Sequence, residues 1–590
     1  MKRRSLLVKF LVWRIKHISD RNFIMILAAL VGILTGFAAI IIKKATRVAQ
    51  YLLTHGFAKT YENYLYFIYP TIGILIAVIF FKFIIRQKIG HGIPSVLFAI
   101  SKNKGNMKPH HMFSSIIGSA FTVGFGGSVG LEGPTVVTGA AIGSNLGRFL
   151  HLNYKKVFLL IGCATAGAIS AIFKSPIAAI IFALEVIMLD LTIASTVPLL
   201  IASVSGALVS FLFLGQDVVY PFRVEDAFKL SQLHYFILFG IIAALVSLYF
   251  TKVYMQIAKL FEKIENWYWR LIIGGGILGL LIFLFPSLFG EGYEVVNSAL
   301  AGNYQFLFDN TFYFDLQDQY YYVFVLLLLI VLMKAIATSV TFGAGGIGGV
   351  FAPSLFIGSI LGLLFATVMN QFNAGLSLSN FALVGMAGMI AGVIHAPLTA
   401  IFMIAEITGG YQLFMPLMIV STISYATIKY FVPNSIYTSL LAKRGQLITH
   451  HKDKAVLSLM KINKLIEKDF KPIDVDATLG DLVELIKESK RNVFPVLDKD
   501  KNLKGIVHLN NIRNVMFDKD LYQTTYVKDL MHIPYNTVAP DDSMESVARQ
   551  IHDSGHFNIP VVKKGKYIGF VSKANVFSSY RRMLRYFSED

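Results

Sequence analysis

The sequence contains very little cysteine and little charge for its length. Cys163 is the only cysteine among 590 residues, which excludes an intrachain disulfide and a metal site built from several thiolates. Charged residues make up 15% of the chain, whereas 55% of its residues are hydrophobic and its mean hydropathy is +0.61. This composition predicts a membrane protein with several spans and not a soluble globule.

Acidic residues are scarce relative to basic ones. Lys and Arg total 54 against 35 for Asp and Glu, which gives a formal net charge of +19. No block of basic residues interleaved with aromatic residues stands out, so nucleic acid is not an expected partner. We assign the basic excess to cytoplasmic loops beside anionic lipid, and the lipid bilayer is an expected partner.

The N-terminus lacks the uninterrupted apolar core of a signal peptide. Basic residues interrupt its apolar run at Lys9, Arg14, Lys16 and Arg21. Residues 1–22 are therefore predicted to form a basic amphipathic helix on the cytoplasmic membrane face. By the positive-inside rule the N-terminus is cytoplasmic, and the expected location is the plasma (inner) membrane.

What the chain does contain is a long series of apolar segments in two matching halves. The segment 166–185 resembles 387–406, and one offset of 221 residues relates both their prolines and their final glutamates. A glycine-rich break that ends at Pro134 has a counterpart that ends at Pro353, at an offset of 219. Two matches in the same order at nearly one offset indicate an internal repeat.

Many of these apolar segments are short, and several are interrupted by glycine or proline. In matching places of two halves, such segments indicate a transporter-type fold with a site near the bilayer midplane. We predict an all-helical, polytopic membrane domain over residues 23–445, with inverted-topology repeats at about 64–215 and 268–432.

The tail, residues 452–590, is mixed in charge, with alternating apolar runs and turn signals. The pattern from Asn492 to Val507 returns from Phe557 to Val571, and a run with helical periodicity precedes each copy. These features predict a soluble α/β domain of two βαβ-like units, residues 452–520 and 528–585. The tail sequence contains no nucleophile–base pair, metal cluster or phosphate loop, so an enzyme is not expected.

The break from Gly126 to Thr135 carries a single carboxylate, Glu132, inside a long apolar region. Non-helical backbone at membrane depth must be buried by protein or reached by water, and a carboxylate there is a functional candidate. Pro134 is suited to open a helix, whose free N–H groups attract anions. We therefore interpret Glu132 as a tethered, protonatable plug in an anion site. A tight glycine turn with an exposed glutamate is the alternative interpretation.

Three further interrupted stretches are expected to converge on the same site. Gly90 to Pro94 and Gly349 to Pro353 combine glycine with proline, which leaves backbone N–H groups free near a helix start. Asn434 to Tyr437 adds a phenolic O–H donor. Partial positive charges of this kind bind an anion weakly enough to release it, as conduction requires.

In order and spacing these stretches resemble the signature motifs of the CLC family of chloride channels and proton/chloride exchangers. Gly90 to Pro94 corresponds to the family's Gly-Ser-Gly-Ile-Pro, Gly130 to Pro134 to its Gly-Arg/Lys-Glu-Gly-Pro, and Gly349 to Pro353 to its Gly-x-Phe-x-Pro. Tyr437 matches its anion-coordinating tyrosine. The resemblance covers about residues 20–445, and the tail resembles the paired cystathionine-β-synthase (CBS) domains of many members.

The resemblance implies a role for each matching residue. Glu132 is the gating glutamate, which competes with the anion when deprotonated and swings away when protonated. The expected anion-binding residues are His91, Gly92, Ile93, Gly130, Gly133, Val350, Phe351 and Tyr437. Chloride or another small anion and a proton at Glu132 are the implied ligands, and a homodimer is the implied assembly. Without the family pattern, Phe351 is a core aromatic residue and Tyr437 a membrane-interface residue.

Three positions depart from the family pattern. His91 replaces the serine that usually binds the central anion, so either its imidazole N–H binds the anion or the ring turns away and backbone N–H groups bind it. Leu131 replaces a basic residue. Val186 stands where coupled exchangers commonly carry an inner proton-transfer glutamate, and valine cannot carry a proton. Val186 therefore favours a passive pathway.

Two further sets of polar residues are interpreted from their position. Glu185 and Glu406 are symmetric intramembrane carboxylates, and we expect both to be structural, hydrogen-bonded to neighbouring helix ends. In the tail, CBS domains often hold a nucleotide ribose with an Asp after the last strand, and the matching positions are Asn511 and Asn575. Asn hydrogen-bonds without charge, so a dimer-stabilising tail is preferred over one that binds an adenine nucleotide. No cofactor is required.

Taken together, these residues predict a dimeric chloride or small-anion channel gated by Glu132, with its N-terminus and CBS tail in the cytoplasm. The alternative is a proton-coupled H⁺/Cl⁻ exchanger, which needs a proton path from the cytoplasm. A fluoride exporter and a membrane sensor acting through the tail are further alternatives.

Overall fold

The computed structural model describes residues 6–54, 65–87, 92–187, 193–222, 227–308, 311, 319–443, 457, 460 and 462–588. The chain divides into two compact units, Met1–Leu447 and Ile448–Asp590. This division lies close to the change of composition in the sequence.

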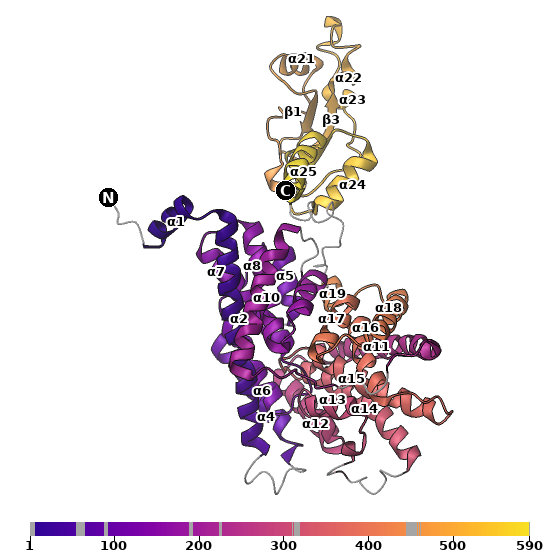
Figure 1. Ribbon diagram of the computed structural model, residues 1–590. Helices are drawn as coiled ribbons and strands as arrows, with labels where there is room; N and C mark the ends of the chain where they lie inside the picture. Colours follow the sequence, from indigo (N-terminus) through magenta and orange to yellow (C-terminus); the bar gives the residue numbers. More distant parts are fainter. Residues whose placement is uncertain are drawn as a thin grey trace. The chain divides into compact units, whose positions relative to one another are not determined.

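The described residues of the first unit are mostly helical. Its first half contains α1 (Leu6–His17), α2 (Asp20–Thr54), α4 (Tyr69–Ile79), α5 (Ile93–Lys102), α6 (His111–Gly124), α7 (Glu132–Phe149), α8 (Tyr154–Phe173), α9 (Pro176–Phe182) and α10 (Ile193–Leu214). Its second half contains α11 (Leu233–Glu262), α12 (Trp267–Leu284), α13 (Tyr293–Leu300), α14 (Tyr320–Gly343), α15 (Phe351–Asn370), α16 (Leu378–Ile394), α17 (Pro397–Ile407), α18 (Phe414–Phe431) and α19 (Ile436–Lys443). In Figure 1 the first-half helices run from indigo to magenta and the second-half helices from magenta to orange.

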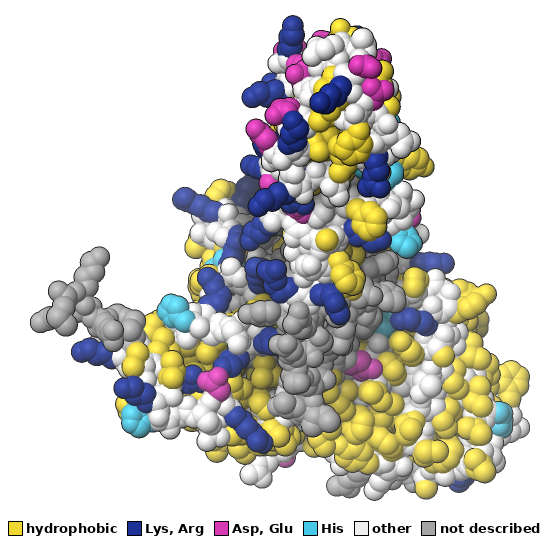
Figure 2. All heavy atoms as spheres, turned by 90° about the horizontal axis from the view of Figure 1, so that it is seen from above, with side chains coloured by type: hydrophobic (Ala, Val, Ile, Leu, Met, Phe, Trp, Pro, Cys, Tyr) yellow, Lys and Arg dark blue, Asp and Glu magenta, His cyan; other side chains and the backbone are white. Residues whose placement is uncertain are grey.

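Within the described residues, eight helical segments are long and apolar enough to cross a membrane. They are Asp20–Leu53, Tyr154–Phe173, Ser195–Leu214, Leu230–Glu262, Trp267–Leu284, Tyr320–Gly343, Phe351–Asn370 and Phe414–Leu441. Large hydrophobic side chains are exposed along α2, α11 and α12, and yellow side chains cover much of the visible surface of the helical unit in Figure 2. Such an apolar surface suits contact with lipid.

The N-terminal helix is shorter than predicted. α1 ends at His17, and Arg21 already belongs to α2. The guanidinium of Arg14 bonds to Asp20 at 2.5 Å and lies 4.0 Å from the ring centroid of Phe23. These contacts hold the turn between the two helices, which ends the single helix predicted for residues 1–22.

The glycine-rich breaks of the two halves pair with each other. Gly130 N donates to Gly349 O at 2.9 Å, and Gly349 N donates to Gly130 O at 2.7 Å, in an antiparallel bridge. Immediately after this bridge, α7 begins at Glu132 and α15 begins at Phe351. The two equivalent helix starts are thereby brought together with opposite chain direction, as expected for inverted repeats.

A second reciprocal contact reinforces this bridge. Thr341 Oγ1 of α14 accepts a hydrogen bond from Ser128 N at 3.2 Å, and Thr122 Oγ1 of α6 accepts one from Ile347 N at 3.1 Å. The two bonds are related by the same offset of 219 residues as the breaks. Each half therefore holds the loop of the other through an equivalent threonine.

The second unit begins with a strand–helix–hairpin motif. β1 (Ile473–Asp474) runs parallel to β2 (Val493–Leu497), which pairs antiparallel with β3 (Leu503–His508). α21 (Leu479–Lys487) connects β1 to β2, so the predicted βαβ element is present and β3 extends it.

The motif is then repeated. β4 (Asn558–Lys563) pairs antiparallel with β5 (Lys566–Ser572), and α24 (Met544–Ser554) precedes β4. Pro495 lies opposite Ile506 in the first hairpin, and Pro560 lies opposite Phe570 in the second. The remaining helices of this unit are α22 (Leu509–Ile512), α23 (Val527–Leu530) and α25 (Lys573–Ser588).

Candidate functional site

A small cavity lies where four helix starts meet. Its volume is about 20 Å³, and it lies at the N-terminal ends of α5, α7, α15 and α19. That volume has room for about one water-sized species. Five of the predicted anion-binding residues line it: Gly92, Ile93, Gly133, Val350 and Tyr437.

Among the described residues, the cavity wall offers hydrogen-bond donors and no carboxylate. The N–H groups in the first turn of a helix have no carbonyl partner within their own helix, and they carry the positive end of the helix dipole. The hydroxyl of Tyr437 is buried and has no hydrogen-bond partner among the described residues. A group that accepts hydrogen bonds and carries negative charge fits this wall.

Glu132 lies beside this cavity as the first residue of α7. Its side chain is 1% exposed, and neither carboxylate oxygen makes a hydrogen bond of normal geometry to the described residues. The backbone N–H groups of Glu132 itself and of Ala352, at the start of α15, lie close enough to act on the carboxylate. A Cβ atom added to Gly349, which lines the cavity, would lie 3.2 Å from Glu132 Oε2. The carboxylate therefore lies between the two paired loops, close to the starts of α7 and α15.

The three other predicted anion-binding residues are Gly130, Phe351 and His91. Gly130 is outside the cavity lining and pairs with Gly349 instead. The ring of Phe351 is buried and lies 5.1 Å from the ring of Phe173, so its aromatic side chain packs in the core while its backbone opens α15. His91 lies outside the described residues.

Val186 lies in the π-helical segment Ala183–Ile187 that follows α9, and it is half-buried. It does not line the cavity. The neighbouring Glu185 is engaged elsewhere, because its Oε2 accepts hydrogen bonds from both the N–H and the hydroxyl of Thr399 at 2.8 Å.

The prediction that Glu185 and Glu406 bond to helix ends is confirmed, and the bonds are reciprocal. Glu406 Oε1 and Oε2 accept from Ile177 N at 3.1 Å and Ala178 N at 2.8 Å, in the first turn of α9. Glu185 accepts in the same way from the first turn of α17. Each carboxylate satisfies N–H groups that the proline-opened helix of the other half leaves free.

Removing one of these carboxylates is expected to destabilise the helical unit. In Glu406→Ala, two charge-assisted hydrogen bonds are lost, at a cost of about 3 kcal/mol. Thermal unfolding of the purified protein in detergent should show a clearly lower midpoint. Glu406→Gln keeps one acceptor and is the control, with an intermediate midpoint. A wild-type midpoint for Glu406→Ala would contradict the capping role.

The sequence did not single out two aromatic residues and two charges near the site. Tyr254 of α11 and Phe342 of α14 line the cavity. Lys334 of α14 is fully buried, and its Nζ donates to Gly290 O at 3.1 Å. Glu291 follows that glycine and accepts from Leu131 N at 3.0 Å. A lone lysine inside the apolar run 320–343 is a signal that could have been found in the sequence.

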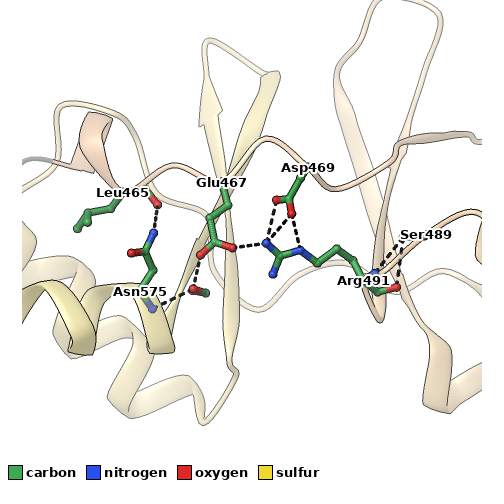
Figure 3. A network of polar contacts seen from close by, with 7 residues as sticks. Leu465, Glu467, Asp469, Ser489, Arg491 and Asn575 are labelled. Carbon is green, nitrogen blue, oxygen red and sulfur yellow. Dashed lines mark hydrogen bonds and ion pairs between the residues drawn. The ribbon is translucent and has the colours of Figure 1, made fainter.

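In the second unit, one of the two candidate nucleotide-binding residues is exposed and the other is hydrogen-bonded within the protein. Asn511 is exposed on α22. Asn575 Nδ2 donates to Leu465 O at 3.2 Å, and its backbone N–H donates to Ser572 Oγ. Ser572 Oγ donates in turn to Glu467. Glu467 also bonds to Arg491, as Figure 3 shows. The amide N–H of Asn575 is thus engaged in joining the start of the tail to α25.

Arg491 connects the two repeated motifs of the second unit. Its guanidinium bonds to Glu467 at 2.6 Å and to Asp469 at 2.7 Å, and it lies 4.6 Å from the ring centroid of Phe470. Glu467 in turn pairs through its backbone with Phe570 of β5. The segment 467–470 therefore lies between both hairpins and is held from each side.

Three imidazoles form one stack in the second unit. The ring centroid of His508 lies 5.0 Å from that of His532 and 6.3 Å from that of His556, with interplanar angles of 16° and 21°. Burial lowers the pKa of His508, and the charges of the other two rings lower it further. Burial and the charge of His556 likewise lower the pKa of His532.

This stack predicts acid sensitivity of the second unit. Because the folded-state pKa values of His508 and His532 lie below the ordinary value of 6.5, the unfolded chain binds more protons in the acid range. Their stabilisation is therefore present above the ordinary pKa and is lost as the pH falls through it. Hydrogen exchange of the full chain should show weaker protection of β3 and β4 at about pH 5.5 than at about pH 7.5.

The double variant His508→Gln/His532→Gln should lose most of that difference. His552→Gln changes an exposed histidine on α24 and is the control. Equal pH dependence of the double variant and the control would show that the stack is not responsible.

Comparisons with known proteins agree with this geometry. A family model described as voltage gated chloride channel matches residues 72–429. A CBS domain model matches residues 462–518 and 527–582.

Relatives and solved structures match about 70% of this chain. A ClcB-like protein of Ralstonia nicotianae, named after chloride channels, is 28% identical over 430 residues, which cover 71% of this chain and 96% of the relative. The H⁺/Cl⁻ exchange transporter ClcA of Yersinia pestis is 28% identical over 442 residues, covering 71% and 87%. The crystal structure of a slow cyanobacterial Cl⁻/H⁺ antiporter superposes with a TM-score of 0.62 at 22% identity, covering 72% of this chain and 98% of that one. This structural likeness establishes the fold.

Proposed function

The chain belongs to the voltage-gated chloride channel (CLC) family and carries a C-terminal pair of CBS domains, and from this premise we propose that it exchanges chloride for protons across its membrane. As a member of this family it is an integral membrane transport protein. The observation that carries the finer proposal is the carboxylate of Glu132, buried without a normal hydrogen bond beside the cavity.

In the proposed cycle, Glu132 competes with chloride for the same donors. The deprotonated carboxylate lies at the paired starts of α7 and α15, where the helix dipoles favour negative charge. Protonation removes that charge, so the side chain is held less strongly and an anion can take its place. Gly92, Ile93, Gly133 and Val350 supply backbone N–H groups or close approach at the cavity, and Tyr437 supplies its hydroxyl. One side chain thereby links proton binding to anion passage.

Two of the compared proteins support exchange over the channel that we expected first, whereas the Ralstonia nicotianae relative carries the name of a chloride channel. The Yersinia pestis protein is named as an exchange transporter, and the solved cyanobacterial structure as an antiporter. The channel remains the second candidate because of Val186, which offers no proton site. Glu185 beside it is bonded to α17, so exchange requires a proton path from the cytoplasm that uses neither residue, such as a chain of water molecules.

We propose chloride as the anion. Tyr437 at the cavity and the Gly-Pro pair after Glu132 match the chloride-transporting pattern and argue against a fluoride exporter. His91 replaces the family's serine, and its side chain is a further donor for the anion when its ring faces the cavity.

A homodimer is proposed from one exposed apolar face. Ile177 and Leu398, equivalent residues in the two halves, are 45% and 54% exposed although each opens an apolar helix. On α10, Leu200, Leu208 and Leu212 are exposed as well. Two copies joined through this face would bury apolar side chains contributed by both halves. The N-terminus and the tail are proposed to be cytoplasmic, and the membrane to be the plasma (inner) membrane.

An adenine nucleotide at the CBS pair remains a weaker proposal. Asn511 is exposed and available, whereas the amide N–H of Asn575 is engaged with Leu465. Titration calorimetry of the full chain with ATP and AMP tests this, and absence of heat would leave the tail as a dimer-stabilising module. Chloride flux that survives deletion of residues 452–590 would exclude a sensor acting through the tail.

The reversal potential of the purified protein in a planar bilayer tests the exchange proposal. Under a chloride gradient, the current of a coupled exchanger reverses at a potential that differs from the chloride equilibrium potential. An added pH gradient shifts this reversal potential. A channel reverses at the chloride potential irrespective of pH. A reversal that a pH gradient leaves unmoved would replace the exchanger with the channel.

A further inference from the structure

A second carboxylate lies next to Glu132. Glu291 is in the short link between the turn Pro286–Leu288 and α13, and its Oε1 accepts from Leu131 N at 3.0 Å. Leu131 directly precedes Glu132, so Glu291 is bonded one residue away from the gating carboxylate. The bond from Leu131 N is made to Oε1, so Oε2 is the oxygen that we assign to carry a proton.

The link that carries Glu291 is clamped to the loop before Glu132. Gly290 N donates to Gly126 O at 3.1 Å, and Ser128 Oγ donates to Leu288 O at 2.8 Å. Lys334 Nζ donates to Gly290 O at 3.1 Å. The two carboxylates are therefore held in fixed relative positions by bonds that do not involve their own oxygens.

The exposures of the two carboxylates differ. Glu132 is 1% exposed, whereas Glu291 as a residue is half-buried. Lys43 of α2 is within electrostatic reach of Glu291, and it lies about 35 Å along the helix from Asp20. With the N-terminus proposed to be cytoplasmic, we assign Lys43 and Glu291 to the opposite, outer face.

The groups around Glu291 include both charges and hydroxyls. Those within electrostatic reach of it are Lys43, Arg47, Glu132, Tyr220, Tyr293 and Lys334, and Lys174 acts on Lys43. The lysines and the arginine balance the carboxylate when it is ionised. The hydroxyl of Tyr293 is buried without a partner among the described residues, so it offers a hydrogen bond to a water molecule beside Glu291.

From this geometry we propose that Glu291 is the outer proton-transfer residue for Glu132. A proton from external water binds Glu291 Oε2 and then passes, through a bridging water molecule, to the Glu132 carboxylate. One O–H bond breaks at Glu291 as one forms at Glu132, so the pair keeps a charge of minus one throughout the transfer. The reverse sequence releases the proton. This inference rests on the proposed exchange function and adds the route by which its proton reaches the gate.

Glu291→Gln in the full chain, reconstituted in liposomes, tests the proposal. The amide oxygen of Gln still accepts from Leu131 N, so the loop geometry is kept while the proton site is lost. We expect proton-driven chloride uptake to slow by about tenfold or more, since positioned proton transfer contributes about 10²- to 10⁴-fold. The rate should also lose its dependence on external pH, while the reversal potential stays at the wild-type value because the stoichiometry is unchanged.

The matched control is Glu294→Gln, which changes an exposed glutamate of α13, three residues after Glu291 in the sequence. It should behave as wild type. A Glu291→Gln rate equal to this control would overturn the proton-transfer role and leave the exchange function standing. A wild-type protein that ignores a pH gradient would instead overturn the exchange function itself.

A second measurement separates proton transfer from a purely structural role. In the Glu132→Gln background no proton has to reach residue 132, so adding Glu291→Gln should leave passive chloride flux unchanged. A further fall in flux in the double variant would mean that Glu291 acts by holding the loop.

Discussion

Substitution of Glu132 by Gln is expected to remove the response of transport to pH altogether. Gln approximates the protonated carboxyl in shape and carries no charge to compete with chloride at the paired helix starts. Under a pH gradient the reversal potential of this variant should not change. For comparison, the reversal potential of a purely proton-selective pathway changes by about 59 mV for each tenfold change in proton concentration. Reconstituted flux combined with bilayer recording measures both quantities.

Glu294→Gln, on the exposed side of α13, is the control for loss of a glutamate as such and should keep the wild-type response. Chloride flux itself should persist in Glu132→Gln because the donors around the cavity are retained. Transport that stays fully pH-dependent in this variant would exclude Glu132 as the gate.

Substitution of Gly349 by Ala is expected to disrupt the site by forcing the starts of α7 and α15 apart. The added Cβ would lie 2.8 Å from Gly133 N and 3.2 Å from Glu132 Oε2. Gly133 N is a backbone atom at the start of α7, so contact is relieved only if the two helix starts move apart. Overpacking of this kind costs about 1–3 kcal/mol, and the displaced donors should lower chloride flux by about tenfold or more.

Gly276→Ala is the matched control, because a Cβ on that glycine of α12 meets no atom within 4 Å. It should keep wild-type flux and raise the unfolding temperature slightly, since Ala favours helix by about 1 kcal/mol over Gly. Equal flux in Gly349→Ala and Gly276→Ala would mean that the paired loops tolerate separation.

The internal repeat accounts for most of what the sequence could predict. Constant offsets of 219 and 221 residues identified the equivalent positions, and the structure brings those positions together in the Gly130–Gly349 bridge. Glycine and proline mark helix starts through local backbone geometry, so the N-terminal ends of α7 and α15 were placed from sequence alone. The same argument placed the capping contacts of Glu185 and Glu406.

The parts that sequence could not supply depend on contacts between distant segments. Tyr254 lies in an unbroken apolar helix and carries no local signal, yet it reaches the cavity formed by Gly92 and Tyr437. Phe351 occupies a motif position but turns its ring to Phe173, because one residue can use its backbone for the site and its side chain for the core. Glu291 lies outside every motif, and only the folded loop shows that it bonds beside Glu132.

The reciprocal bonds of Glu185 to the start of α17 and of Glu406 to the start of α9 also have a consequence for synthesis of the chain. Glu185 emerges from the ribosome 213 residues before Leu398, the first of its partners, an interval of about 10 to 40 s at bacterial and eukaryotic elongation rates. Throughout that interval the first half holds a carboxylate in the membrane without the helix end that it will bond. A chain that stops between the halves therefore never forms the helix start that Glu185 bonds, and its first half keeps a carboxylate without that partner.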